Sequence, residues 1–171
     1  SKENIGLLYR DKNDMALWLK ITKNQDLVNG GMRAEITYDN RNPEGSTMWY
    51  SWDIYIPEDF EMPQNYNSLD KKPWIIMGQF HDQPDITLEE NWDNYTSYSP
   101  PISYGFRYDG EKYILQLQYG NYLSEIKYFP FTISLGKWNR ITTEIKWSFD
   151  DNGYANSYLN GELVASVVGG N

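Results

Sequence analysis

The stretch WIIMGQFH, residues 74–81, ends in the one histidine of the chain. Read as a strand, it places Gln79 and His81 on one face, roughly 7 Å apart, because side chains alternate with period two. The same face begins with Ile75 and Met77. An amide can bind an anionic group, and an imidazole, with a usual pKa of about 6.5, can remove a proton beside it. The pair therefore favours proton abstraction next to a negative charge.

Arginine side chains on other expected strands could complete a site for an anion. Arg33 alternates with Glu35 in MRAEITYD, and Arg107 lies in ISYGFRY. An arginine fork matches a carboxylate, and a carbon-bound proton beside a carboxylate is weakly acidic until that charge is neutralised. Arg33 and Gln79 could neutralise the carboxylate while His81 takes the proton. This set of groups suits β-elimination at a uronic acid.

The substrate contacts and the acid follow from the same interpretation. A tyrosine could protonate the leaving glycosidic oxygen, and the candidates in expected cleft strands are Tyr104, Tyr108, Tyr113 and Tyr119. The residues expected to contact the substrate are Arg107, Glu35, Tyr104 and Lys146. Local positive charge from these strands would have to overcome a net charge of −9.

Each of these residues also has an ordinary explanation. A histidine at a strand end is usually a hydrogen-bonded surface residue, and Arg33 and Glu35 could be an ion pair on a solvated sheet. For Arg107, a functional role and an ordinary structural role are equally consistent with the sequence. Other chemistries fit poorly: no serine has a nucleophile-elbow glycine pattern, no phosphate-binding glycine loop occurs, and one histidine without cysteine makes zinc improbable. Paired carboxylates for glycoside hydrolysis stay open, because 24 acidic residues always supply pairs.

Composition restricts the class of protein. A length of 171 residues suits one domain, and aromatic residues make up 16% of it, enough to pack between sheets or to stack on sugar rings. The net charge of −9 and the isoelectric point near 4.6 argue against nucleic acid as a partner. No apolar run approaches the length of a membrane span, and SKENIGLLYR is unlike a signal peptide, so we expect a soluble chain whose signal peptide has been removed.

Alternation of apolar and polar residues recurs along the chain and helical periodicity is rare. Alternating segments cover 32–39, 47–57 and 74–81, and later strands are separated by the turn pairs Asp109-Gly110, Asn152-Gly153 and Asn160-Gly161. The polar, proline-punctuated segments 61–73 and 82–101 read as surface loops. Short strands with recurrent turns predict an all-β chain, an antiparallel β-sandwich or jelly roll.

Several of these segments together resemble the heparin lyase I-like polysaccharide lyases. The matching stretches are RAEI (33–36), WYSWDIYIPEDF (49–60), IIMGQFHDQPD (75–85), PPISYGFR (100–107) and GKWNRITTEIKWSFDDNGYANSYLNGELV (136–164). Glucuronan lyases and jelly-roll alginate lyases are similar. The resemblance implies a concanavalin A-like jelly-roll β-sandwich with an open cleft, in which Gln79 neutralises the carboxylate and His81 is the base, together with an arginine and a tyrosine.

These lyases usually continue past a hairpin like NGELV into a strand resembling Tyr-x-Lys-x-Gly-x-Tyr, which carries the catalytic tyrosine. This chain ends at Asn171. We therefore expect a single jelly-roll domain over 1–171 that lacks its last C-terminal strand or strands.

The leading hypothesis is a polysaccharide lyase acting on a uronic-acid polymer such as glucuronan, alginate or a glycosaminoglycan. The alternatives are a carbohydrate-binding module without turnover and a structural sandwich; only a lyase would create unsaturated uronate. We expect an anionic polysaccharide as partner, a monomer, and a secreted or periplasmic location in a bacterium. No cofactor is expected to be required. The DDNG segment, 150–153, could hold a structural Ca²⁺ or be an ordinary hairpin turn.

Overall fold

The computed structural model describes all residues except 1–3, 10–11, 23–24, 29–30, 39–40, 63–73, 85–86, 88, 92, 97 and 122–124. The described residues form ten strands in three sheets and no α-helix, so none of them belongs to a helix that could cross a membrane. The chain divides into two compact units, the N-terminal unit Ser1–Arg41 and the sandwich unit Asn42–Asn171. The strands of the two larger sheets all belong to the second unit, and the single domain expected over 1–171 stays a prediction.

The N-terminal unit contains one hairpin. Strands β1 (Ile5–Tyr9) and β2 (Met15–Leu19) pair antiparallel, with Ile5 opposite Leu19. Sequence analysis did not predict this hairpin, because IGLLY and MALWL are short apolar runs without alternation. The strand predicted over 32–39 is wrong for the described residues 32–38, which are not part of a strand. Alternation alone does not supply the hydrogen-bonded partner that a strand needs.

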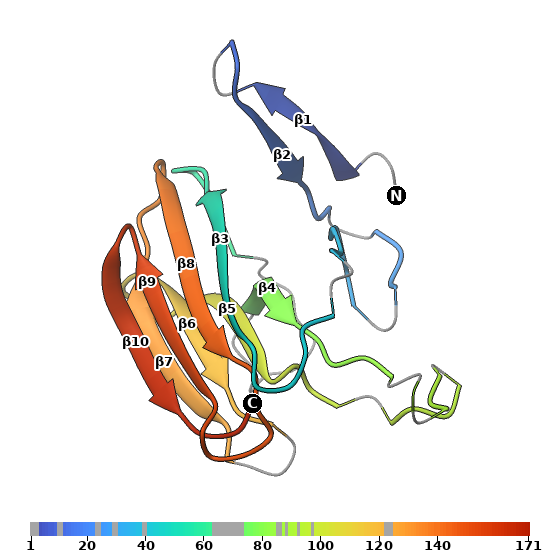
Figure 1. Ribbon diagram of the computed structural model, residues 1–171. Helices are drawn as coiled ribbons and strands as arrows, with labels where there is room; N and C mark the ends of the chain where they lie inside the picture. The colour runs from blue at the N-terminus through green and yellow to red at the C-terminus, as the bar shows by residue number, and fades with distance from the viewer. Residues whose placement is uncertain are drawn as a thin grey trace. The chain divides into compact units, whose positions relative to one another are not determined.

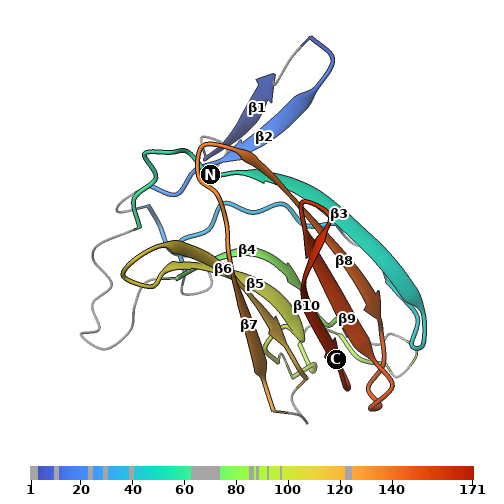
Figure 2. The same ribbon diagram turned by 90° about the vertical axis from the view of Figure 1, so that its left-hand side faces the viewer.

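The sandwich unit consists of two antiparallel four-stranded sheets that stack as two layers (Figure 1 and Figure 2). The back sheet has the order β10 (Glu162–Val168), β9 (Tyr154–Leu159), β8 (Trp138–Lys146), β3 (Thr47–Tyr55). The front sheet has the order β4 (Trp74–Phe80), β5 (Ile102–Tyr108), β6 (Tyr113–Tyr119), β7 (Lys127–Thr132). The all-β jelly-roll sandwich predicted from the sequence is confirmed.

Turn chemistry sets the register of two hairpins. Asn160 and Gly161 have φ values of 53° and 89°, as a two-residue type I′ turn between β9 and β10 requires. Between β5 and β6, the Asp109 carboxylate accepts hydrogen bonds from the backbone N–H groups of Glu111 and Lys112, both at 2.9 Å. Both predicted turns are confirmed. The β8–β9 connection is longer than a turn at Asn152-Gly153 and covers residues 147–153.

Tyr104 is one of the two largest fully buried side chains among the described residues, and it joins the two sheets. Its hydroxyl hydrogen-bonds to Thr143 and Ser157 on the back sheet, and burial raises the pKa of the Tyr104 phenol. Tyr119 is buried too, and Tyr113 packs against the same core. The prediction that Tyr104 contacts substrate is therefore wrong: its side chain points between the sheets, where a polymer cannot reach it.

We predict that Tyr104→Phe lowers the free energy of unfolding by about 1–3 kcal/mol, because two buried hydroxyls lose a hydrogen-bond partner. Urea unfolding would measure the change. Tyr108→Phe is the matched control: Tyr108 is 42% exposed, and its variant should stay within about 0.5 kcal/mol of the parent chain. Equal stability of the Tyr104→Phe variant and the parent would contradict the proposed role of this hydroxyl.

Candidate active site on the front sheet

A β-bulge at Met77 decides which side chains of β4 face outward. The pairing of β4 with β5 shifts register between Ile76 and Gly78, so Met77 is the extra residue. Before the bulge, Ile75 lies opposite the buried Phe106 and packs against the core. Such an insertion reverses the alternation of every residue that follows it.

The bulge moves Gln79 to the outer face of the front sheet. Beyond it, Gly78 lies against the core residue Trp52, where a Cβ would be 3.4 Å from the indole ring, and Phe80 packs into the core. Gln79 is exposed. The predicted sharing of one face by Gln79, Ile75 and Met77 is therefore wrong, because a strict period of two assumes no bulge.

Gln79 begins a row of polar side chains that crosses the front sheet. It lies opposite Ser103, Ser103 lies opposite Gln118, and Gln118 lies opposite Tyr128. Neighbouring strands are about 4.8 Å apart, so the row places an amide, a hydroxyl, an amide and a phenol at regular spacing, although Ser103 itself is buried. Sequence analysis missed Ser103, Gln118 and Tyr128. The polar row can hydrogen-bond the hydroxyl and carboxylate groups of a sugar chain.

His81 follows the last residue of β4 and its side chain is 38% exposed. Its Nδ1 lies 2.8 Å from Oδ1 of Asp82 and 3.1 Å from the Asp82 backbone oxygen. The Tyr95 hydroxyl donates a hydrogen bond to Oδ2 of Asp82. Burial first, then the Asp82 carboxylate and Glu90, raise the pKa of Tyr95. The imidazole thus stands at the edge of the sheet with one nitrogen beside a carboxylate.

Arg107 lies on the outer face, on the other side of β5 from Tyr104 as predicted. It is opposite the exposed Trp74 of β4. Its Nε is buried and has no hydrogen-bond partner among the described residues. Arg107 lies four positions after Ser103, and this spacing corresponds to roughly 13 Å along a strand. Arg107 therefore cannot bind the same carboxylate as Gln79, but it can bind another one farther along a polymer.

Two predicted site residues belong to the N-terminal unit. Arg33 and Glu35 form an ion pair, with Nη1 of Arg33 3.5 Å from Oε1 of Glu35. The ordinary explanation from the sequence, a solvent-exposed ion pair, is thus observed, although on an irregular segment. Their predicted part in catalysis and substrate binding stays a prediction.

Lys146 lies on the opposite side of the sandwich from Gln79, so the structure does not bring the two together. It ends β8 in the back sheet, where Ile145 beside it is fully buried and Lys146 consequently points outward. The predicted role of Lys146 in the same cleft is therefore wrong for the front-sheet site. Alternation in the sequence predicted which face of its strand Lys146 occupies, but it did not predict to which of the two sheets that strand belongs.

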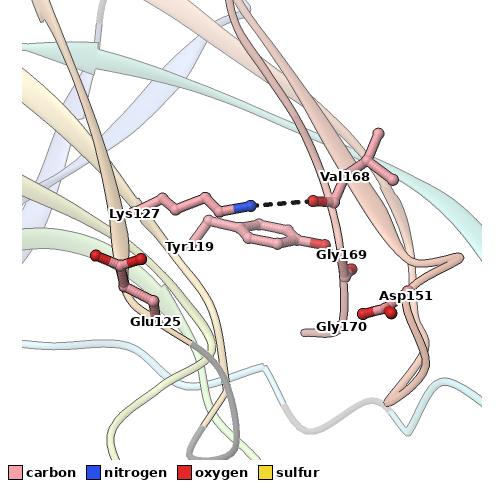
Figure 3. A pocket seen from close by; sticks show the side chains of 7 residues that line it. All are labelled: Tyr119, Glu125, Lys127, Asp151, Val168, Gly169 and Gly170. Atoms are coloured by element: carbon pink, nitrogen blue, oxygen red, sulfur yellow. Dashed lines mark hydrogen bonds between the residues drawn. The ribbon is translucent and has the colours of Figure 1, made fainter.

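A cavity of about 260 Å³ lies at the other edge of the sandwich, near the ends of β6 and β10 (Figure 3). Its lining residues are Tyr119, Glu125, Lys127, Asp151, Val168, Gly169 and Gly170. The Lys127 ammonium donates a hydrogen bond to the Val168 backbone oxygen at 3.3 Å. Two carboxylates against one ammonium make the cavity unsuitable for a polyanion. Tyr119, one of the tyrosines considered as the acid, lines the cavity, whereas Gln79, His81 and Arg107 do not.

Metal ligands do not gather in the part of the chain that the structure describes: no three His, Cys, Asp or Glu side chains lie close enough together to hold an ion. In the DDNG segment, the Gly153 N–H donates a hydrogen bond to the Asp150 backbone oxygen at 3.2 Å, as in a turn. The calcium ion considered for 150–153 stays a prediction.

Comparison with known proteins supports this fold. The chain is similar in structure to an endo-β-1,4-glucuronan lyase from the fungus Trichoderma reesei, with a TM-score of 0.66 and 17% sequence identity. The match covers 96% of this chain and spans 66% of the length of that protein. Among curated proteins none matches in sequence. The family described as Polysaccharide lyase matches residues 9–171, nearly the whole chain, and the chain therefore belongs to that family.

Proposed function

We propose that this polysaccharide lyase cleaves a uronic-acid polymer by β-elimination on the outer face of the front sheet. The observation that carries the proposal is the exposed His81 just beyond the end of β4, two positions after Gln79, which begins the polar row. The resemblance to heparin lyase I-like enzymes gives this Gln-x-His pair its roles. Because the structurally similar protein acts on a glucuronan, glucuronan is the first substrate to test. A polymeric substrate also favours a secreted or periplasmic enzyme.

The elimination needs a base, a neutralised carboxylate and a proton for the leaving oxygen. His81 removes the proton from C5, the carbon that bears the carboxylate. The electron pair forms the C4–C5 double bond, the C4–oxygen bond breaks, and the oxygen leaves with a proton from an acid. The Gln79 amide hydrogen-bonds the carboxylate, whose negative charge grows as the C5 proton leaves. Among the tyrosines proposed from the sequence as the acid, Tyr104, Tyr113 and Tyr119 pack in the core.

Arg107 and Trp74 supply a second contact point for the same polymer. Arg107 is half-buried and its Nε lacks an acceptor among the described residues; the accessible part of its guanidinium group can bind a substrate carboxylate. Trp74 is 58% exposed and lies directly opposite Arg107, so its ring can stack on the sugar that carries this carboxylate. At roughly 13 Å from the Ser103 position, this contact binds a different sugar from the one that reacts. The enzyme should therefore prefer polymers to very short chains.

We predict that His81→Ala abolishes elimination and leaves the fold intact, because the exposed side chain has little packing to lose. Loss of a general base should lower kcat by about 10²–10⁴-fold. Gln79→Ala should lower kcat more than it weakens polymer binding, since the amide acts most strongly on the developing charge. Ultraviolet absorbance of the unsaturated uronate measures turnover.

Urea unfolding of both variants is the control, with changes within about 0.5 kcal/mol expected at these exposed positions. Normal turnover by the folded His81→Ala variant would exclude His81 as the base. Binding of polyuronides by the parent without any absorbance change would instead indicate a carbohydrate-binding module.

We further predict that Arg107→Ala weakens glucuronan binding about tenfold, because the variant loses a charge-assisted hydrogen bond to the polymer. Lys146→Ala is the matched control: it removes the same charge from the opposite side of the sandwich and should leave the affinity unchanged. Titration calorimetry with the His81→Ala background would measure binding without cleavage. Affinity should also fall from low salt to 0.5 M salt, where screening is strong. Equal effects of the two substitutions would place the polymer elsewhere.

A further inference from the structure

The surroundings of the His81 ring favour one of its two neutral tautomers. Nδ1 lies 2.8 Å from Oδ1 of Asp82 and 3.1 Å from the Asp82 backbone oxygen. A carboxylate and a carbonyl can only accept hydrogen bonds, so Nδ1 must carry the proton to donate to either of them. In a neutral ring this leaves the lone pair on Nε2.

The Asp82 carboxylate is held in place from its other oxygen. Oδ2 accepts the hydrogen bond from the Tyr95 hydroxyl. Oδ1 is buried and has no hydrogen bond among the described residues, although Nδ1 of His81 lies within 2.8 Å of it. A buried carboxylate oxygen without a donor is costly, so the arrangement is most stable when His81 Nδ1 is protonated.

Tyr95 links this carboxylate to the long β4–β5 connection. It lies in the segment 82–101, thirteen positions after Asp82 in the sequence, and it is partly buried. Burial and the charges of Asp82 and Glu90 keep its pKa above the ordinary tyrosine value, so the hydroxyl stays protonated and remains a donor at neutral and moderately alkaline pH. The hydrogen bond ties the connection back to the end of β4, next to His81.

We propose that Asp82 and Tyr95 are positioning residues that hold His81 as the Nδ1–H tautomer, with Nε2 as the nitrogen that takes the substrate proton. The tautomer follows from the contacts alone, whereas the role of Nε2 rests on the proposed lyase function. Asp82 orients the ring and Tyr95 orients Asp82, and neither needs to touch the substrate. Both positioning residues, Asp82 and Tyr95, follow the Gln-x-His pair in the sequence.

The chain has one histidine, so its tautomer can be measured without assignment ambiguity. Long-range ¹H–¹⁵N NMR of the ¹⁵N-labelled chain, at a pH where the ring is neutral, distinguishes Nδ1–H from Nε2–H. We expect mainly Nδ1–H in the parent chain, although histidine in water favours Nε2–H. Asp82→Ala should move the population towards Nε2–H, and the milder Tyr95→Phe should do so in part. Tyr55→Phe, on the back sheet, is the control and should change nothing.

Turnover supplies the second measurement. Asp82→Ala should lower kcat at least about tenfold with KM little changed, since the base is misoriented while the binding groups remain. A parent chain in the Nε2–H form, or an Asp82→Ala variant with unchanged tautomer, would overturn the positioning role even in an active enzyme. An Nδ1–H tautomer that depends on Asp82, in a chain that cleaves no polyuronide, would support the positioning role and overturn the proposed function. The two hypotheses can thus fail separately.

Discussion

The β-bulge at Met77 is the constraint on which the candidate site depends. If β4 paired regularly along its whole length, without the bulge, Gln79 would share the face of Ile75 and point towards the core. An amide there would be buried among apolar side chains and would lose its hydrogen bonds to water. With the bulge, one strand contributes Ile75 and Phe80 to the core and presents Gln79 outward. A local irregularity in pairing thus serves packing and function together.

Core contacts hold the front sheet in place around the bulge. Tyr104 on β5, next to the bulged strand, hydrogen-bonds across the sandwich to Thr143 and Ser157. Gly78 lets the Trp52 indole approach β4 closely, and that indole packs edge-on against Tyr104 at 5.2 Å between ring centroids. Close packing from the back sheet therefore holds the two strands that carry Gln79 and Ser103. The outer face can then remain polar without loss of order.

The net charge of −9 is a second constraint on the proposed function, because a negatively charged chain repels an anionic polymer. The site proposed on the front sheet meets it with neutral donors near the sugar that would react and with Arg107 at a distance along the strand. The outer face of the back sheet treats its charges differently: Arg140 forms a bidentate ion pair with Asp53 at 2.8 and 3.1 Å, so this arginine has a carboxylate partner already. Arg107 has no such partner within the described part of the chain.

The amino-acid sequence by itself determined the strands, the turns and the types of residue available for chemistry. Alternation and the Asp109-Gly110 and Asn160-Gly161 turns predicted the sandwich, because period and turn conformation are local properties of the chain. The β5–β6 connection covers four residues, 109–112, and this length places Ser103 opposite Gln118, a register that the Asp109-Gly110 pair alone did not predict. Gln79 and His81 were found because an amide and a lone imidazole stood out at the end of an apolar run.

Only the tertiary structure decided which face each side chain occupies and which groups meet. Tyr104 and Lys146 were assigned to the cleft from their predicted strands. In the structure, the Tyr104 side chain is buried in the core, and Lys146 belongs to the back sheet. The partnership of His81, Asp82 and Tyr95 joins a strand end to a loop residue far along the sequence. Register shifts, sheet membership and loop contacts depend on interactions between distant segments, and a periodic pattern within one segment does not contain that information.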